Sequence, residues 1–72
     1  TVVAYEAMLQ DQNGRCLICQ GAMTPPAVDH CHASGRVRGL LCRGCNAALG
    51  LFRDCPEILA RAIAYLTSSS SG

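Results

Sequence analysis

The stretch that decides the fold is VDHCHASGRVRGLLCRGCNAALG, residues 28–50. Within 23 residues it holds an Asp-His pair, a second histidine, a glycine at a turn, a Cys-x-x-Cys pair and an asparagine. A second Cys-x-x-Cys pair lies upstream, and 22 residues separate the two pairs. This separation is close to the spacing of a Cys₄ zinc site. The pattern therefore predicts a small zinc-stapled α+β domain, with a ββα core between an N-terminal and a C-terminal helix.

The chain is short enough to need such a staple. Its 72 residues make one small domain, and a chain of this size buries only about 60% of the surface that it exposes when unfolded. Its six cysteines are the candidates for the staple. Disulfide bonds and redox chemistry are the alternatives, but the paired spacing favours zinc. Reduced cysteines in turn indicate a cytoplasmic protein.

The two cysteine pairs are expected to hold one structural zinc ion through Cys16, Cys19, Cys42 and Cys45. Four thiolates close a tetrahedral site and leave no open position for chemistry. A rival ligand set would replace one of them with His30, Cys31 or His32, but the symmetry of the two pairs disfavours it. Gly21 is expected to relieve the tight backbone that follows the first pair.

The first half of the chain reads as a helix followed by a hairpin. Apolar residues at helical spacing predict a helix over residues 1–12, which Asn13-Gly14 would end. Strands are predicted at residues 27–30 and 36–41. Regular alternation in the second strand would place Val37, Gly39 and Leu41 on one face and Arg36, Arg38 and Leu40 on the other.

The second half is expected to be helical. The second cysteine pair opens a helix that runs to about Leu51, and Pro56 suits the first turn of another helix. Residues 1–66 are expected to form a single zinc-bound domain. Residues 67–72 are rich in serine and are expected to be a disordered tail.

Charge is concentrated on the cysteine-and-histidine segment. The net charge is only +1, and all six basic residues are arginines. Residues 15–53 hold five of them against Asp29 alone, a local charge of +4. Arginine suits phosphate oxygens, so Arg36, Arg38 and Arg43 are candidates to hold a nucleic-acid backbone. An ordinary solvated surface is the alternative. No run approaches the length of a membrane span, which argues against a membrane partner.

Four polar residues, Asp29, His30, His32 and Asn46, are the candidates for chemistry. A carboxylate and an amide oxygen are hard ligands that suit Mg²⁺ or Mn²⁺. His30 titrates near neutral pH and could take a proton from an attacking water. Ordinary hydrogen-bonded histidines are the alternative. Neighbours on a regular strand face opposite ways, so Asp29 and His30 can share a site only where the strand ends or bends.

These residues resemble the phage recombination endonuclease VII family, within the His-Me finger (ββα-metal, HNH-type) nucleases. The resemblance spans about residues 5–66. It rests on the motifs QNGRCLIC at 12–19, DHCH at 29–32, GRVRGLLC at 35–42 and CNAA at 45–48, together with Gly50.

The resemblance implies a Cys₄ structural zinc and Mg²⁺-dependent cutting of DNA phosphodiester bonds. It makes Asp29 and Asn46 ligands of the catalytic ion, His30 the general base and His32 an auxiliary residue near the metal or the phosphate. DNA is the implied partner. The family's type member also dimerises, so a homodimer is possible, although the sequence does not show one.

The chain departs from that type member at two positions. Cys31 stands where the type member has an acidic residue between the two histidines. Leu49 stands where it has a glutamate at the edge of the site, and Asp54 and Glu57 are the candidates to replace that carboxylate.

The leading hypothesis is therefore a metal-dependent DNA endonuclease that nicks or cuts duplex or branched DNA. A non-catalytic zinc module that binds nucleic acid or protein is the alternative, and a nuclease disabled by the Leu49 change is a third. Only an active nuclease needs Asp29, His30 and Asn46 together.

Overall fold

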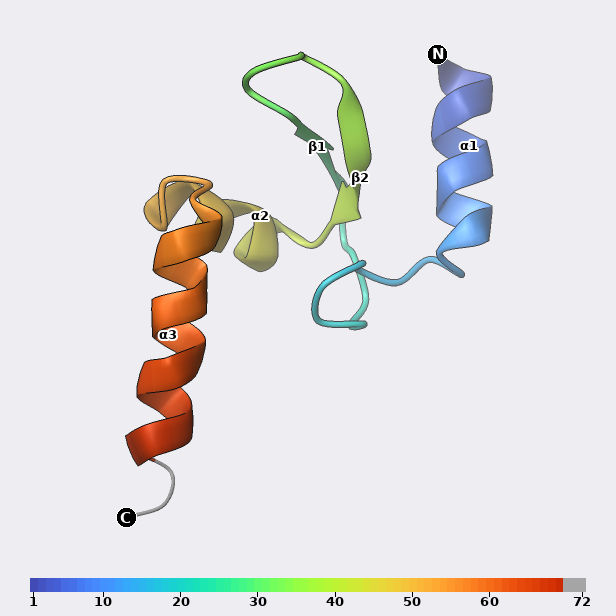
Figure 1. Ribbon diagram of the computed structural model, residues 1–72. Coiled ribbons are helices and arrows are strands. Elements are labelled where there is room, and N and C mark those ends of the chain that lie inside the picture. The colour runs from blue at the N-terminus through green and yellow to red at the C-terminus, as the bar shows by residue number, and fades with distance from the viewer. Residues whose placement is uncertain (70–72) are drawn as a thin grey trace.

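The computed structural model describes residues 1–69. The N-terminal helix lies on one side of a central hairpin, and the two helices that follow the hairpin lie on the other side (Figure 1). The elements follow in the order α1 (Val2–Asp11), β1 (Ala27–His30), β2 (Val37–Leu41), α2 (Arg43–Leu51) and α3 (Pro56–Ser69). The order β1, β2, α2 is the expected ββα core, with one helix before it and one after it. This confirms the predicted small α+β fold.

Helix α1 begins and ends at the signals that the sequence carries. The Oγ1 atom of Thr1 accepts a hydrogen bond from the Ala4 N–H at 3.1 Å and caps the first turn. After Gln12, both Asn13 and Gly14 adopt left-handed backbone conformations, with φ of 54° and 68°. The helix therefore ends where the Asn-Gly pair predicts.

Gln12 joins the end of α1 to β2. Its side-chain amide donates to the Leu40 carbonyl at 2.9 Å, and its Oε1 atom accepts from the Leu40 N–H at 3.0 Å. The amide thus occupies both main-chain hydrogen-bonding groups of Leu40, as a neighbouring strand would. Because Leu40 is fully buried, these groups have no water to replace Gln12.

The hairpin contains a bulge that changes which side chains share a face. Asp29 pairs with Gly39 and His30 pairs with Val37, which leaves Arg38 as an extra residue in β2. Val37 and Leu41, predicted to share a face, consequently line different hollows. The expected alternation is therefore wrong, because it assumed a regular ladder; β2 also begins one residue later than expected.

The C-terminal half follows the expected boundaries up to α3. The Cys42 thiol caps α2 by accepting from the Cys45 N–H at 3.4 Å. Helix α3 begins at Pro56 and extends away from α2 (Figure 1). It runs to Ser69, so residues 67–69, expected in the tail, are helical; the rest of the expected tail lies outside the described residues. None of the described helices is long and apolar enough to cross a membrane.

The core of the described chain is small and built around sulfur. The buried side chains are Cys16, Met23, Leu40 and Leu41. Half-buried residues surround them: Tyr5, Met8, Leu9, Cys42, Cys45 and Leu49. Three of these ten residues are predicted zinc ligands, so the predicted staple is part of the core.

Candidate functional site

The fold brings the four predicted zinc ligands together. The Sγ atoms of Cys16, Cys19, Cys42 and Cys45 all lie within 4.8 Å of one another. Those of Cys19 and Cys42 are 3.8 Å apart. A tetrahedron with Zn–S bonds of ~2.3 Å has edges of roughly 3.8 Å. The cluster therefore has the composition and the size of a Cys₄ zinc site.

Backbone N–H groups point at these sulfurs in both cysteine pairs. Ile18 donates to the Sγ atom of Cys16 at 3.4 Å, and Gly21 donates to that of Cys19 at 3.3 Å. The tight backbone is at Gln20, whose φ is 65°, rather than at Gly21. Gly21 instead leaves room for sulfur, since a Cβ atom there would lie 3.3 Å from the Cys19 Sγ.

The thiols differ in how readily they ionise. Burial opposes ionisation of Cys16, but hydrogen bonds from the Cys19, Cys42 and Ile18 backbone outweigh it and lower its pKa to about 6. The pKa of Cys45 rises to about 12, because the neighbouring Cys42 sulfur hydrogen-bonds to it and burial disfavours its charge. Sulfurs this close cannot all be thiolates unless a cation balances them, which is the chemistry that Zn²⁺ supplies.

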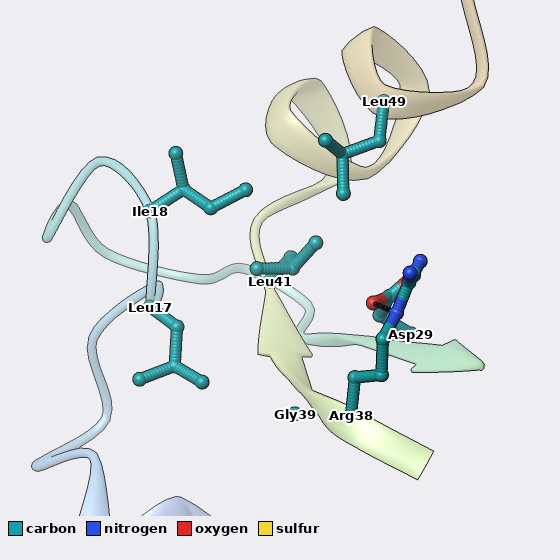
Figure 2. Close-up of a pocket in the computed structure, with 7 residues that line it drawn as sticks. All are labelled: Leu17, Ile18, Asp29, Arg38, Gly39, Leu41 and Leu49. Atoms are coloured by element: carbon teal, nitrogen blue, oxygen red, sulfur yellow. Dashed lines mark hydrogen bonds and ion pairs between the residues drawn. The ribbon is translucent and has the colours of Figure 1, made fainter. Parts of the chain in front are cut away.

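A second polar cluster centres on Arg38, which joins two carboxylates. The Arg38 Nε donates to the Asp29 Oδ2 at 2.6 Å, and one terminal nitrogen donates to the Asp29 Oδ1 at 3.0 Å (Figure 2). The same nitrogen donates to the Asp54 Oδ1 at 2.8 Å, and the other donates to the Asp54 Oδ2 at 3.1 Å. All four carboxylate oxygens are therefore bound to one guanidinium group.

This ion-pair cluster fixes the charge of its members. The hydrogen bonds that Arg38 donates to Asp29 and to Asp54 raise the pKa of Arg38 further above its ordinary value. Hydrogen bonds from Arg38 lower the pKa of Asp54 although its partial burial opposes this, and the charges of Arg38 and His32 add to the lowering. Asp54 is consequently ionised at neutral pH.

The predicted catalytic residues are divided between two hollows. Asp29 lines a hollow of about 270 Å³ with Arg38 and Leu49 (Figure 2). His30 lines a different hollow of about 480 Å³, between α1 and the hairpin, together with Tyr5 and Val37. The bulge between Asp29 and His30 thus does not bring both side chains into one of these hollows.

The other predicted site residues lie nearby but apart. Asn46 is half-buried in the first turn of α2, next to the zinc ligand Cys45, and α2 packs against both strands. His32 is exposed just after β1, and Arg36 and Arg43 are exposed as well. Neither hollow described above is lined by Asn46.

The oxygen donors of Asp29 and Asn46 fit Mg²⁺ or Mn²⁺ in kind. The geometry adds a condition that the sequence did not indicate: both Asp29 oxygens already accept from Arg38. A cation that binds Asp29 must therefore compete with the guanidinium group. A signal for this contact was present, because opposite charges on paired strands attract one another across a hairpin.

The chain is similar to known proteins over most of its length. A protein-family model described as Recombination endonuclease VII matches residues 1–68. The Gene 59 protein of Mycobacterium phage D29 is 51% identical over 70 residues, which cover 92% of this chain and 42% of the relative. The Gene 59 protein of Mycobacterium phage L5 is 50% identical over 66 residues, which cover 86% and 40%. The chain thus spans about two-fifths of the length of these curated relatives.

Proposed function

Because the chain belongs to the recombination endonuclease VII family, we propose that it is a metal-dependent DNA endonuclease that hydrolyses phosphodiester bonds. The observation that carries this proposal is the family match over nearly the whole chain, residues 1–68. The clustered cysteines support it, because a structural zinc would hold together the ββα core on which the proposed catalytic residues lie.

The proposed catalytic roles follow the chemistry of each side chain. Asp29 and Asn46 would hold Mg²⁺ or Mn²⁺, which when bound stabilises negative charge on a phosphate under attack. His30 ends β1 and is exposed, so its imidazole can accept a proton from a water molecule beside bound DNA. His32 would assist at the phosphate, and Arg36, Arg38 and Arg43 would contact the DNA backbone.

One observation favours a second candidate function, a zinc module that binds nucleic acid without cutting it. Arg38 occupies both oxygens of Asp29, and His30 lines the other hollow. A protein that uses its zinc only as a scaffold would tolerate this arrangement, because binding through exposed arginines needs neither a second metal nor a base.

Plasmid nicking in Mg²⁺ or Mn²⁺ separates the two candidates. We expect the His30→Ala variant to fold, to keep its zinc and to lose nicking by about 10²–10⁴-fold, the usual contribution of a general base. Gln10→Ala, an exposed change on α1, is the control and should nick like wild type. Circular dichroism and zinc content would check the fold of each variant.

Each other outcome has a defined meaning. Equal nicking by wild type and His30→Ala would reject His30 as the base. Absence of nicking by both, with DNA binding intact in a gel-shift measurement, would favour the non-catalytic zinc module.

A further inference from the structure

The cluster of Asp29, Arg38 and Asp54 is assembled by three backbone features that lie far apart in the chain. Asp29 lies on β1, and Arg38 is the extra residue of the bulge in β2. Asp54 precedes α3 in a left-handed conformation, with φ of 52°, and its N–H donates to the Leu49 carbonyl at 2.7 Å. The fold itself therefore places both carboxylates next to one guanidinium group.

The contacts are also shielded from water to different degrees. The side chains of Asp29 and Asp54 are 12% and 21% exposed, whereas that of Arg38 is 39% exposed. The carboxylates are thus held in place, while the cationic side chain lies on the solvent side. If a metal ion replaces the guanidinium group at Asp29, the more exposed Arg38 side chain is therefore the one that can move aside.

Charge explains why an exchange would be required. Two carboxylates and one guanidinium carry a net charge of −1, so the cluster attracts a further cation. A divalent ion bound to an oxygen of Asp29 would lie within a few ångströms of the guanidinium group, and like charges at that distance repel one another. Asp54 offers an alternative partner, because both of its oxygens already accept hydrogen bonds from the terminal nitrogens of Arg38.

We propose that Arg38 is a positioning residue that competes with the catalytic divalent ion for Asp29, and that Asp54 retains the guanidinium group beside the site once the ion has bound. This inference rests on the proposed function for the assignment of Asp29 as a metal ligand. It adds that the affinity for the ion is set by Arg38, and that Asp54 acts through Arg38 rather than as a ligand of its own. From its place beside the site, the released guanidinium group can contact a DNA phosphate.

The test is Mn²⁺ binding to the zinc-loaded chain without DNA, measured by electron paramagnetic resonance. Arg38→Gln should bind Mn²⁺ about tenfold more tightly than wild type, which corresponds to ~1.4 kcal/mol. Arg36→Gln is the matched control, because it removes the same charge from an exposed position of the same hairpin. Equal affinities of Arg38→Gln and Arg36→Gln would overturn the competition.

A second pair of variants isolates Asp54. In the Arg38→Gln background, adding Asp54→Asn should leave Mn²⁺ affinity unchanged, because Asp54 then has no guanidinium group to hold. A marked loss of affinity in that background would instead make Asp54 a ligand and overturn its proposed role. Arg38→Lys keeps the charge and should bind Mn²⁺ much like wild type, which covers the case in which Arg38→Gln folds poorly.

Failure of this inference is distinct from failure of the proposed function. Adding Asp29→Asn to the Arg38→Gln variant should abolish Mn²⁺ binding. If no variant binds Mn²⁺, or if Asp29→Asn has no effect, the metal assignment falls and this inference falls with it. If Asp29→Asn abolishes binding while Arg38→Gln and Arg36→Gln bind alike, the metal site stands and only the role of Arg38 is rejected.

Discussion

Arg38 connects two parts of the molecule that are far apart in the sequence. It contacts β1 and the turn before α3 at the same time, and it does so because a bulge adds it to β2. Regular alternation, read from the sequence, placed Arg38 beside Leu40 on one face. Gly39 is a general signal for a bulge, since an isolated glycine inside a strand often marks one, but it does not indicate which residue is the extra one. Opposite charges on paired strands made a contact between Arg38 and Asp29 predictable in kind, whereas the bulge and the contact with Asp54 could not be predicted from the sequence.

The pairing of Asp54 with Arg38 predicts a dependence of stability on pH. The folded protein has the lower Asp54 pKa, so the stabilisation is present above the unfolded value and is lost as the pH falls through the folded value. We expect wild type to lose stability below about pH 4 more steeply than Asp54→Asn does. Urea unfolding between neutral pH and pH 3 would measure this, and parallel curves would contradict it.

At the scale of elements, a polar side chain adds to the apolar packing between α1 and β2. The sequence located the end of α1 well, because Asn13 and Gly14 are adapted to left-handed backbone. It gave no indication that Gln12 would turn its amide to Leu40. Such a contact depends on how the end of a helix packs against a strand, and local sequence propensity does not predict that packing.

Replacing Gln12 tests this contact directly. Gln12→Ala would leave the buried Leu40 N–H without its partner, whereas the Leu40 C=O would keep the Leu17 N–H at 3.4 Å; we expect a cost of about 1–3 kcal/mol in the free energy of unfolding. Gln10→Ala, an exposed change on the same helix, should cost little. Urea titrations of both variants would measure the difference, and equal stabilities would show that the amide contact contributes nothing.

At the scale of the whole molecule, the cysteine spacing determined most of what could be predicted. Two Cys-x-x-Cys pairs predicted a single cluster, and the four sulfurs lie within 4.8 Å of one another. The hairpin lies between the two pairs, and α2 begins at the second pair, so the cluster also fixes where the ββα core is held. The relation between Asp29 and His30 was beyond the same reasoning, since it depends on strand geometry within a few residues. Their catalytic roles therefore stay predictions.

The four-cysteine cluster predicts that its members are needed for folding and that the other cysteines are not. Cys42→Ser should abolish the folded state, because metal binding of this kind is worth ~10–16 kcal/mol, as much as the stability of a whole domain. Cys31→Ser, a change at a half-buried cysteine outside the cluster, should leave folding intact. Circular dichroism with and without a strong chelator would check both. Folded, zinc-free Cys42→Ser would contradict the prediction.

Cys16 is a predicted zinc ligand and also a fully buried core side chain. We therefore expect folding and zinc binding to be one event in this protein rather than two successive ones. A newly made chain would have no finished scaffold waiting for its ion, and the supply of zinc in the cell would limit how many functional copies accumulate. Starvation for this element would deplete the protein without any change in its synthesis.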